Sequence, residues 1–491
     1  MHTIPRVIPQ PLLTPFSIFQ IPNLGTKLKQ DSMPLSYTPR KMITHPSNNY
    51  FYVIESDHRV WGEDAAEKKL AELVCTCVPP YLFVAEGQVS QRKRQRINED
   101  ILKLPPVFGR PKAPAGTWGS CIRIIDPVQA TTVGLVQLDN NEAAFSIAVV
   151  PFSTKGGEPH LIVGTAQDTL LSPRSCTSGF LRTYSFTNEG TGLELLHKTE
   201  TDDVPLAVMA FQGRLVAGVG KALRIYDMGK KKLLRKVENK VCYHLALWRY
   251  VITDFVQSFG GAIISLETQG SRIIVGDMQE SVHYAVYKAP ENRLLVFADD
   301  SQPRWTTATA MLDYNTIAGA DRFGNVFVNR LDSKVSDQID DDPTGAGILH
   351  EKGVLMGAPH KTTLLAHFHV GDLVTSLHQV ALIAGGREVL LYTGLHGTIG
   401  ILVPFVSKDD VDFISTLEQH MRTQGLSIVG RDHLSWRGYY VPVKAVVDGD
   451  LCEAFAQLPA HKQSSIAEEL DRSVGDVLKK LDQLRTTASG F

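Results

Sequence analysis

The sequence predicts a mainly β fold, a β-propeller of about seven blades, followed by a small C-terminal helical domain. The first observation is a strand signature, two apolar or small residues followed by glycine, that recurs along the chain. Its glycines, at spacings of 54, 58, 43 and 75 residues, are Gly164, Gly218, Gly276, Gly319 and, more loosely, Gly394. Repetition on this scale is typical of propellers, whose blades have about 40–50 residues. The second observation is the lack of long helical patterns from 120 to 405, which argues against an α/β enzyme.

The elements follow in order along the chain. Residues 1–17 carry prolines and little periodicity, so an irregular segment is expected there. The propeller is expected over 18–405, where short strands alternate apolar and polar residues. Three loop insertions are predicted within it, at 74–114, 241–257 and 331–360. The first and third of these are expected to be disordered, because one is basic with several prolines and the other holds an acidic run.

After Phe405 the pattern changes to helices, so a helical domain is predicted over 406–491. Asp409 or Asp410 can cap a helix that ends at Gly425. Its apolar positions are Val411, Ile414, Leu417 and Met421. Ser465 and Glu468 have the spacing of a capping box. Ser473 precedes an amphipathic helix with apolar positions Val474, Val477, Leu478, Leu481 and Leu484.

Composition limits the function classes. The 491 residues are 43% hydrophobic and 21% charged, which is ordinary for a globular protein. The net charge of −2 gives no general attraction to nucleic acid, so RNA contact is expected to be peripheral at most and to need a local basic patch. Six cysteines lack zinc or disulfide spacing, which favours a reducing compartment. No run of about 18 uncharged apolar residues occurs, so no membrane contact is expected.

No catalytic residue, cofactor or metal site is predicted. Gly218–Lys221 is similar to a phosphate loop, but Ala222 follows where Ser or Thr is needed. His367 and His369 would share one strand face and could bind a metal, yet no third ligand stands at a suitable spacing. Acidic runs such as Asp340–Asp342 are expected to be solvated surface.

Two segments rich in aromatic and basic residues are predicted to bind a partner. Arg304 and Trp305 lie between predicted strands, as do Asp321 and Arg322, so all four are expected at one rim of the propeller. The second segment links the first two C-terminal helices and contributes Asp432, His433, Trp436, Arg437 and Tyr439. Trp, Tyr and Arg are enriched among interface anchors. Ordinary core packing is the alternative for both segments.

Longer stretches carry a family resemblance. They include Gln137–Phe145, Phe297–Asp300 with Pro303–Trp305, Ala318–Asn325, Gly400–Phe405 and Gly430–Leu434. These stretches resemble the family of splicing factor 3b subunit 3. The wider family includes the large subunit of damaged-DNA-binding protein and the 160 kDa cleavage and polyadenylation specificity factor subunit. The resemblance covers about residues 18–489 apart from two interruptions.

The resemblance implies a nuclear, non-enzymatic scaffold of the U2 snRNP that acts in pre-mRNA splicing. Such scaffolds have three propellers and a helical domain, and this chain would contain the third propeller and the helical domain. The implied partners are the HEAT-repeat subunit and the small subunit of splicing factor 3b, together with other U2 snRNP proteins. The alternatives are an adaptor for DNA-damage recognition or ubiquitin ligation, a cleavage and polyadenylation factor, and a propeller hydrolase.

The two interruptions of the resemblance, Val74–Gln91 and Val241–Gln257, share an unusual feature. Both begin with Val-Cys and end with Gln. Val-Cys can be encoded by GTNTGY and Gln by CAG, which fit the two ends of an intron. One hypothesis is that both are introns translated in frame, and the alternative is that both are evolved loops. We refer to them as the interrupting segments.

Overall fold

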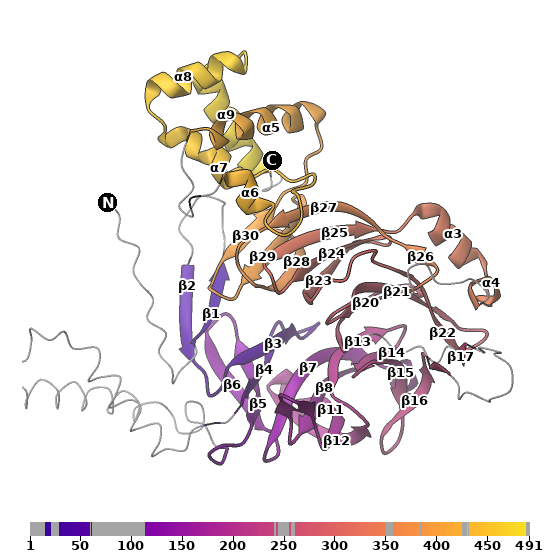
Figure 1. The fold of residues 1–491 in the computed structure, drawn as a ribbon. Coiled ribbons are helices and arrows are strands. Elements are labelled where there is room, and N and C mark those ends of the chain that lie inside the picture. Colours follow the sequence, from indigo (N-terminus) through magenta and orange to yellow (C-terminus); the bar gives the residue numbers. More distant parts are fainter. Residues whose placement is uncertain are drawn as a thin grey trace, which may run out of the picture. The chain divides into compact units, whose positions relative to one another are not determined.

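The computed structural model describes residues 15–20, 29–58, 60, 113–239, 242–243, 255–256, 261–349, 357–382, 385–424, 430 and 432–487. The chain divides into two compact units, Met1–Gln20 with Lys29–Lys236 and Ile21–Leu28 with Val237–Phe491. Most elements of both units are labelled in Figure 1. Among the described residues, no helix is long and apolar enough to cross a membrane.

The first unit contains three four-stranded antiparallel sheets whose strands follow one another as in propeller blades. Blade 1 is β3 (Pro39–Thr44), β4 (Phe51–Asp57), β5 (Gly119–Asp126) and β6 (Thr131–Gln137). Blade 2 is β7 (Glu142–Pro151), β8 (Pro159–Gln167), β11 (Ser178–Thr187) and β12 (Gly192–Thr201). Blade 3 is β13 (Pro205–Phe211), β14 (Arg214–Val219), β15 (Ala222–Met228) and β16 (Leu233–Glu238). Two hairpins accompany them, β1 (Pro15–Gln20) with β2 (Lys29–Pro34) and β9 (Leu170–Leu171) with β10 (Arg174–Ser175).

The second unit repeats this pattern. Blade 4 is β19 (Ile263–Gln269), β20 (Arg272–Asp277), β21 (Ser281–Lys288) and β22 (Arg293–Asp299), and β26 (His360–Lys361) pairs in parallel with β22. Blade 5 is β23 (Thr306–Asp313), β24 (Thr316–Asp321), β25 (Asn325–Arg330) and β27 (Thr363–His369). Blade 6 has three strands, β28 (Val374–Ala381), β29 (Glu388–Gly394) and β30 (Ile399–Leu402). The predicted class, a mainly β propeller followed by helices, is confirmed.

The recurring glycines occupy equivalent places, because each lies in the second strand of a blade. The packing shows why a side chain is excluded there. A Cβ on Gly276 would lie 2.0 Å from Ser265 Oγ in its own blade and 3.2 Å from Thr309 Cγ2 in the next. Threonine hydroxyls of blade 5 bind the neighbouring blades, since Thr309 Oγ1 donates to Ser265 Oγ of blade 4 at 2.8 Å and Thr307 Oγ1 to Val374 O of blade 6 at 2.7 Å.

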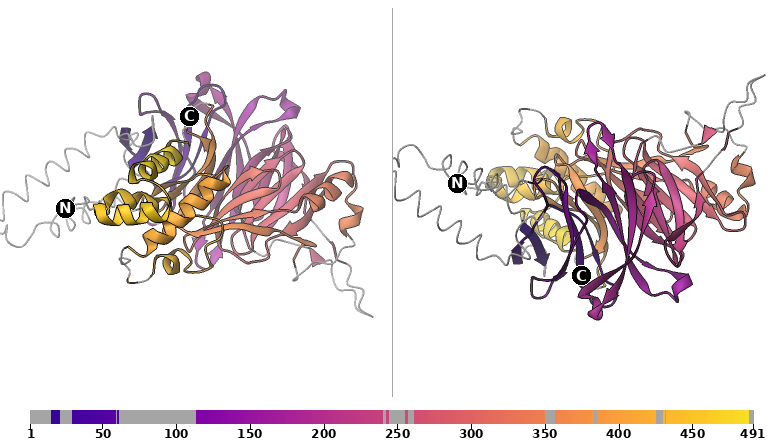
Figure 2. Two further views of the ribbon diagram at one scale, coloured as in Figure 1. Left: turned by 90° about the horizontal axis from the view of Figure 1, so that it is seen from above. Right: turned by 90° about the horizontal axis from the view of Figure 1, so that it is seen from below.

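The C-terminal helices have a core of their own. They are α5 (Lys408–Arg422), α6 (His433–Arg437), α7 (Gly449–Glu453), η5 (Ala454–Gln457), α8 (Ala460–Glu469) and α9 (Val474–Thr487). Leu417, Phe455 and Val477 are fully buried, in one cluster with other apolar side chains of these helices. Figure 2 shows α5, α7, α8 and α9 gathered as one group of orange and yellow helices. This group belongs to the same compact unit as blades 4–6, so the two units do not divide at 405.

Several local predictions differ from the structure. Six blade-like sheets are seen among the described residues, not about seven, and β1 and β2 form a separate two-stranded sheet. β1 begins at Pro15, inside the segment predicted to be irregular. Helix α5 begins at Lys408 after Ser407, one or two residues before the predicted caps. Ser465 lies inside α8 and caps nothing, because α8 begins at Ala460.

The predicted loop insertion at 331–360 contains two helices, α3 (Ser333–Asp341) and α4 (Ala346–Leu349). Asp332 caps α3 by accepting a hydrogen bond from Lys334 N at 2.9 Å. Ile339 is buried against the core of blades 4 and 5. The acidic run therefore belongs to an amphipathic helix, α3, whose apolar residue Ile339 packs into this core.

The interrupting segments fall largely outside the described residues. Val74–Gln91 lies wholly outside them, as does most of the insertion at 74–114. Of Val241–Gln257, only β17 (Cys242–Tyr243) and β18 (Phe255–Val256) are described, and they pair antiparallel. The predicted helix end at Gly425 also lies outside the described residues.

Candidate partner-binding surface

The turn before β23 and the turn after β24 lie side by side. The strand register places Thr306 opposite Asp321, and Arg322 N donates to Trp305 O at 2.8 Å. The Arg322 guanidinium lies 4.8 Å from the centre of the Trp305 ring, within range of a cation–π interaction. Trp305 is 41% exposed, and Arg322 is exposed as well. The prediction that these two residues present a surface together therefore agrees with their geometry.

Arg304 and Asp321, by contrast, point inward. Arg304 is buried, donates to Asp300 Oδ2 at 3.2 Å and to Gln302 Oε1 at 2.7 Å, and stacks on Phe327 at 4.5 Å. The buried carboxylate of Asp321 accepts hydrogen bonds from the backbone N–H groups of Phe323 and Asn325 at 2.9 and 3.1 Å. Neither is placed to touch a partner; they hold the two turns in shape instead.

The second predicted segment forms α6 and fastens it to β27. Arg437 reaches Asp448 with two nitrogens, Nε at 2.7 Å and Nη2 at 2.6 Å. Its Nη1 donates to the backbone carbonyls of His369 at 3.0 Å and Val370 at 3.2 Å. His433 Nε2 lies 2.9 Å from the same Asp448 carboxylate but is not aligned for a hydrogen bond, so the contact is one of proximity. We call Arg437, Asp448 and His433 the α6 clamp.

The remaining residues of this segment have different surroundings. Trp436 is half-buried, and a Cβ on Gly371 would lie 2.9 Å from its ring, so the indole packs against bare backbone. Asp432 is exposed at the start of α6, where its carbonyl accepts from Trp436 N at 3.0 Å. Trp436 and Arg437 therefore follow the alternative prediction for this segment, which was ordinary packing within the protein. Tyr439 remains half exposed.

The two segments meet in a continuous set of exposed aromatic rings, which we call the aromatic ridge: Trp305, Phe323, Tyr439 and Tyr440. Their exposed fractions are 41, 45, 50 and 50%. The ring centres are 6.1 Å apart for Trp305 and Phe323, 5.3 Å for Phe323 and Tyr440, and 4.8 Å for Tyr440 and Tyr439. Contiguous exposed aromatic surface of this kind marks interaction sites, whereas single exposed apolar residues do not.

Sequence reasoning missed several residues of this surface. Phe323 and Tyr440 join the two segments, and His369 supports the tyrosines with ring distances of 5.6 and 6.2 Å. Asp448, the acceptor of the clamp, lies eleven residues beyond Arg437. Tyr440 stood beside Tyr439 in the second segment, so it could have been found. No signal in the sequence indicated that Phe323 would lie against it.

His367 and His369, the pair considered as metal ligands, are both buried in β27. Among the described residues no group of three or more His, Cys, Asp or Glu side chains could hold a metal ion. His367 is fully buried, and neither ring nitrogen has a hydrogen-bond partner among the described residues. Burial, together with the nearby positive charge of Arg304, lowers the pKa of His367 to about 4. Burial also lowers the pKa of His369. Both imidazoles are therefore neutral near pH 7.

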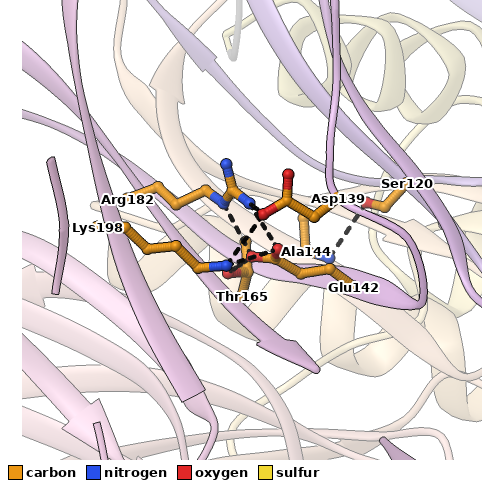
Figure 3. A network of polar contacts seen from close by, with 7 residues as sticks. All are labelled: Ser120, Asp139, Glu142, Ala144, Thr165, Arg182 and Lys198. Atoms are coloured by element: carbon orange, nitrogen blue, oxygen red, sulfur yellow. Dashed lines mark hydrogen bonds and ion pairs between the residues drawn. The ribbon is translucent and has the colours of Figure 1, made fainter. Parts of the chain in front are cut away.

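A second polar network, on blade 2, is satisfied within itself (Figure 3). Arg182 reaches Glu142 with Nε at 2.8 Å and Nη2 at 2.6 Å, and Lys198 Nζ lies 3.1 Å from both Glu142 and Asp139. Partial burial opposes ionisation of Asp139, but the Lys198 hydrogen bond and the Arg182 charge hold its pKa below the usual value. Two cations balance two carboxylates, so we assign this network to holding β7, β11 and β12 together.

Comparison with known proteins gives close relatives along almost the whole chain. It is 55% identical over 476 residues to the pre-mRNA-splicing factor RSE1 of Mycosarcoma maydis and 45% identical over 469 residues to splicing factor 3B subunit 3 of Danio rerio. It is 44% identical over 473 residues to spliceosome-associated protein 130 A of Arabidopsis thaliana. These alignments cover 95–96% of this chain.

The same alignments cover only 36–37% of the relatives, so the chain spans about a third of their length. A family model, the CPSF A subunit region, matches residues 119–457. The matched stretch begins at the start of β5 in blade 1 and ends with η5, so it takes in most of the blades and the aromatic ridge. Because it comprises well over half of the chain, the chain belongs to the family of the CPSF A subunit region.

Proposed function

We propose that this chain is part of a non-enzymatic scaffold of the splicing factor 3b complex, which acts in pre-mRNA splicing in the nucleus. The observation that carries the proposal is the 55% identity to a pre-mRNA-splicing factor over 96% of the chain. Propellers usually serve as binding platforms, and this one presents an exposed aromatic ridge. The proposed partners are the HEAT-repeat subunit and the small subunit of splicing factor 3b, with other U2 snRNP proteins.

The clustered charges of the described residues fit a structural role. The charged groups that lie close together are engaged with each other, as in the α6 clamp and the blade 2 network. Catalytic sites instead need carboxylates, imidazoles or metal ligands that converge on an open position.

The test is affinity purification of the tagged full chain from nuclear extract, followed by mass spectrometry. We expect the HEAT-repeat and small subunits of splicing factor 3b to be recovered in near-equal amounts with the chain. Recovery of ubiquitin-ligase or polyadenylation-complex subunits in their place would support the alternative functions and refute this one.

A further inference from the structure

An exposed cation, Arg322, lies against the aromatic ridge and has no acidic partner among the described residues around it. Arg322 is exposed, and its guanidinium lies over the Trp305 ring. The acidic groups nearby are already engaged: Asp321 accepts from backbone N–H groups, and Asp300 pairs with Arg304. Asp448 is buried in the α6 clamp. A carboxylate on a partner would therefore meet Arg322 without competition from these acids.

The ridge is also held in place before any partner arrives. The Asp321 carboxylate fixes the turn that carries Phe323, and Arg322 N ties that turn to Trp305 O. The buried ring of His369 packs against the rings of Tyr439 and Tyr440. Side chains that are already ordered lose little conformational freedom on binding, which raises the affinity that a given contact area can give.

The geometry favours a protein segment over a nucleic acid. Single-stranded nucleic acids bind to open aromatic faces within a groove of many cations. Here the neighbouring rings touch one another at angles of 46°, 42° and 79°, so they present mixed edges and faces. Within the described part of the chain, Arg322 is the one cation stacked on a ring of the ridge, and the whole chain has a net charge of −2. Such a surface fits apolar side chains next to one carboxylate.

We propose that the aromatic ridge with Arg322 is a docking site for a short partner segment that places aromatic or apolar side chains beside an acidic residue. The acidic residue pairs with the Arg322 guanidinium, and the apolar side chains cover Phe323 and Tyr440. This inference rests on the proposed scaffold function, because it names the chemistry of the partner that the scaffold would hold.

The first test needs no cellular partner. Binding of the full chain to a random copolymer of glutamate and tyrosine is measured by fluorescence anisotropy, with poly-glutamate and oligo-uridine as comparison probes. We expect the copolymer to bind at least tenfold more tightly than either comparison probe. Tighter binding of oligo-uridine, or equal binding of poly-glutamate, would overturn the proposed chemistry.

The second test uses matched variants. Arg322→Glu and Phe323→Ala should each weaken copolymer binding at least tenfold, and Arg322→Lys should weaken it less than Arg322→Glu. Arg293→Glu makes the same charge change on an exposed residue at the far end of β22, and should leave binding unchanged. Circular dichroism and melting temperature check that each variant is folded. Equal losses in Arg322→Glu and Arg293→Glu would show a general charge effect and refute the site.

The purification described under the proposed function separates the two ideas. If splicing factor 3b subunits copurify with both the wild-type chain and Arg322→Glu, the scaffold stands and the ridge inference fails. If the wild-type chain recovers no such subunit while the copolymer binds through Arg322, the scaffold proposal fails and the ridge chemistry stands.

Discussion

The α6 clamp makes a strong prediction about how the helical segment is held to blade 5. In Arg437→Met the aliphatic stem is kept and the guanidinium is lost. The Asp448 carboxylate, only 3% exposed, then loses both of its Arg437 contacts, and the carbonyls of His369 and Val370 lose their donor. Removing one partner of a buried ion pair costs about 3–5 kcal/mol, because the other charge stays buried.

The measurement is native-state hydrogen exchange followed by mass spectrometry. Since each 1.4 kcal/mol is tenfold in an equilibrium constant, exchange in peptides covering 363–370 and 432–449 should be about 100- to 4000-fold faster in Arg437→Met. Peptides from blades 1–3 should be unaffected. The helices α5, α8 and α9 should keep their protection, because their shared core lies apart from the clamp.

The matched control is Arg485→Met. Arg485 Nη2 lies 2.7 Å from Asp482, but the two side chains are 43% and 61% exposed. Surface pairs of this kind contribute about 0–1 kcal/mol, so the control should exchange at nearly the wild-type rate. If Arg437→Met and Arg485→Met behave alike, the reasoning that burial makes the clamp strong is wrong.

Three further predictions follow. The pKa of His367 is about 4 in the folded state and about 6.5 in the unfolded state, so the unfolded state is protonated first as the pH falls. The free energy of unfolding therefore keeps its full value above pH 6.5 and falls by up to about 3 kcal/mol towards pH 4. Urea unfolding of His367→Phe should lose that part of the pH dependence, and an unchanged pH dependence would contradict the prediction. Gly276→Ala should destabilise the fold by about 1–3 kcal/mol, because the new Cβ meets the Ser265 hydroxyl. The double variant with Ser265→Ala should regain part of this stability. Thermal melts in which the double variant regains none would mean that backbone strain dominates. If the interrupting segments are introns, sequencing of the mature transcript should find both removed, and transcripts and tryptic peptides that retain them would refute the idea.

The fold class was readable from the sequence because blades repeat. The second strand of a blade carries a glycine at Gly164, Gly218, Gly276 and Gly319, so the signature recurs at blade spacing. A Cβ on Gly164 or Gly276 would meet atoms of the same blade and of the next one, and a Cβ on Gly319 would meet Phe327 of its own blade. The change to a 3.6-residue period after Phe405 likewise predicted the helices, since each must bury one stripe of apolar residues. Blade number was less certain, because insertions such as 331–360 change the spacing without adding a blade.

The candidate surface was only half determined by the sequence. Composition singled out Trp305, Arg322 and Tyr439 as anchors, because these residue types favour interfaces. Tertiary contacts decide which basic side chains face outward. Arg304 and Arg437 point inward because they pair with the buried carboxylates of Asp300 and Asp448. Arg322 instead stacks on the exposed ring of Trp305. Contacts between residues more than a hundred positions apart, such as Phe323 with Tyr440, exist only once the helical segment lies on blade 5. Local sequence sets strand and helix periods, but the pairing of distant side chains is decided by packing.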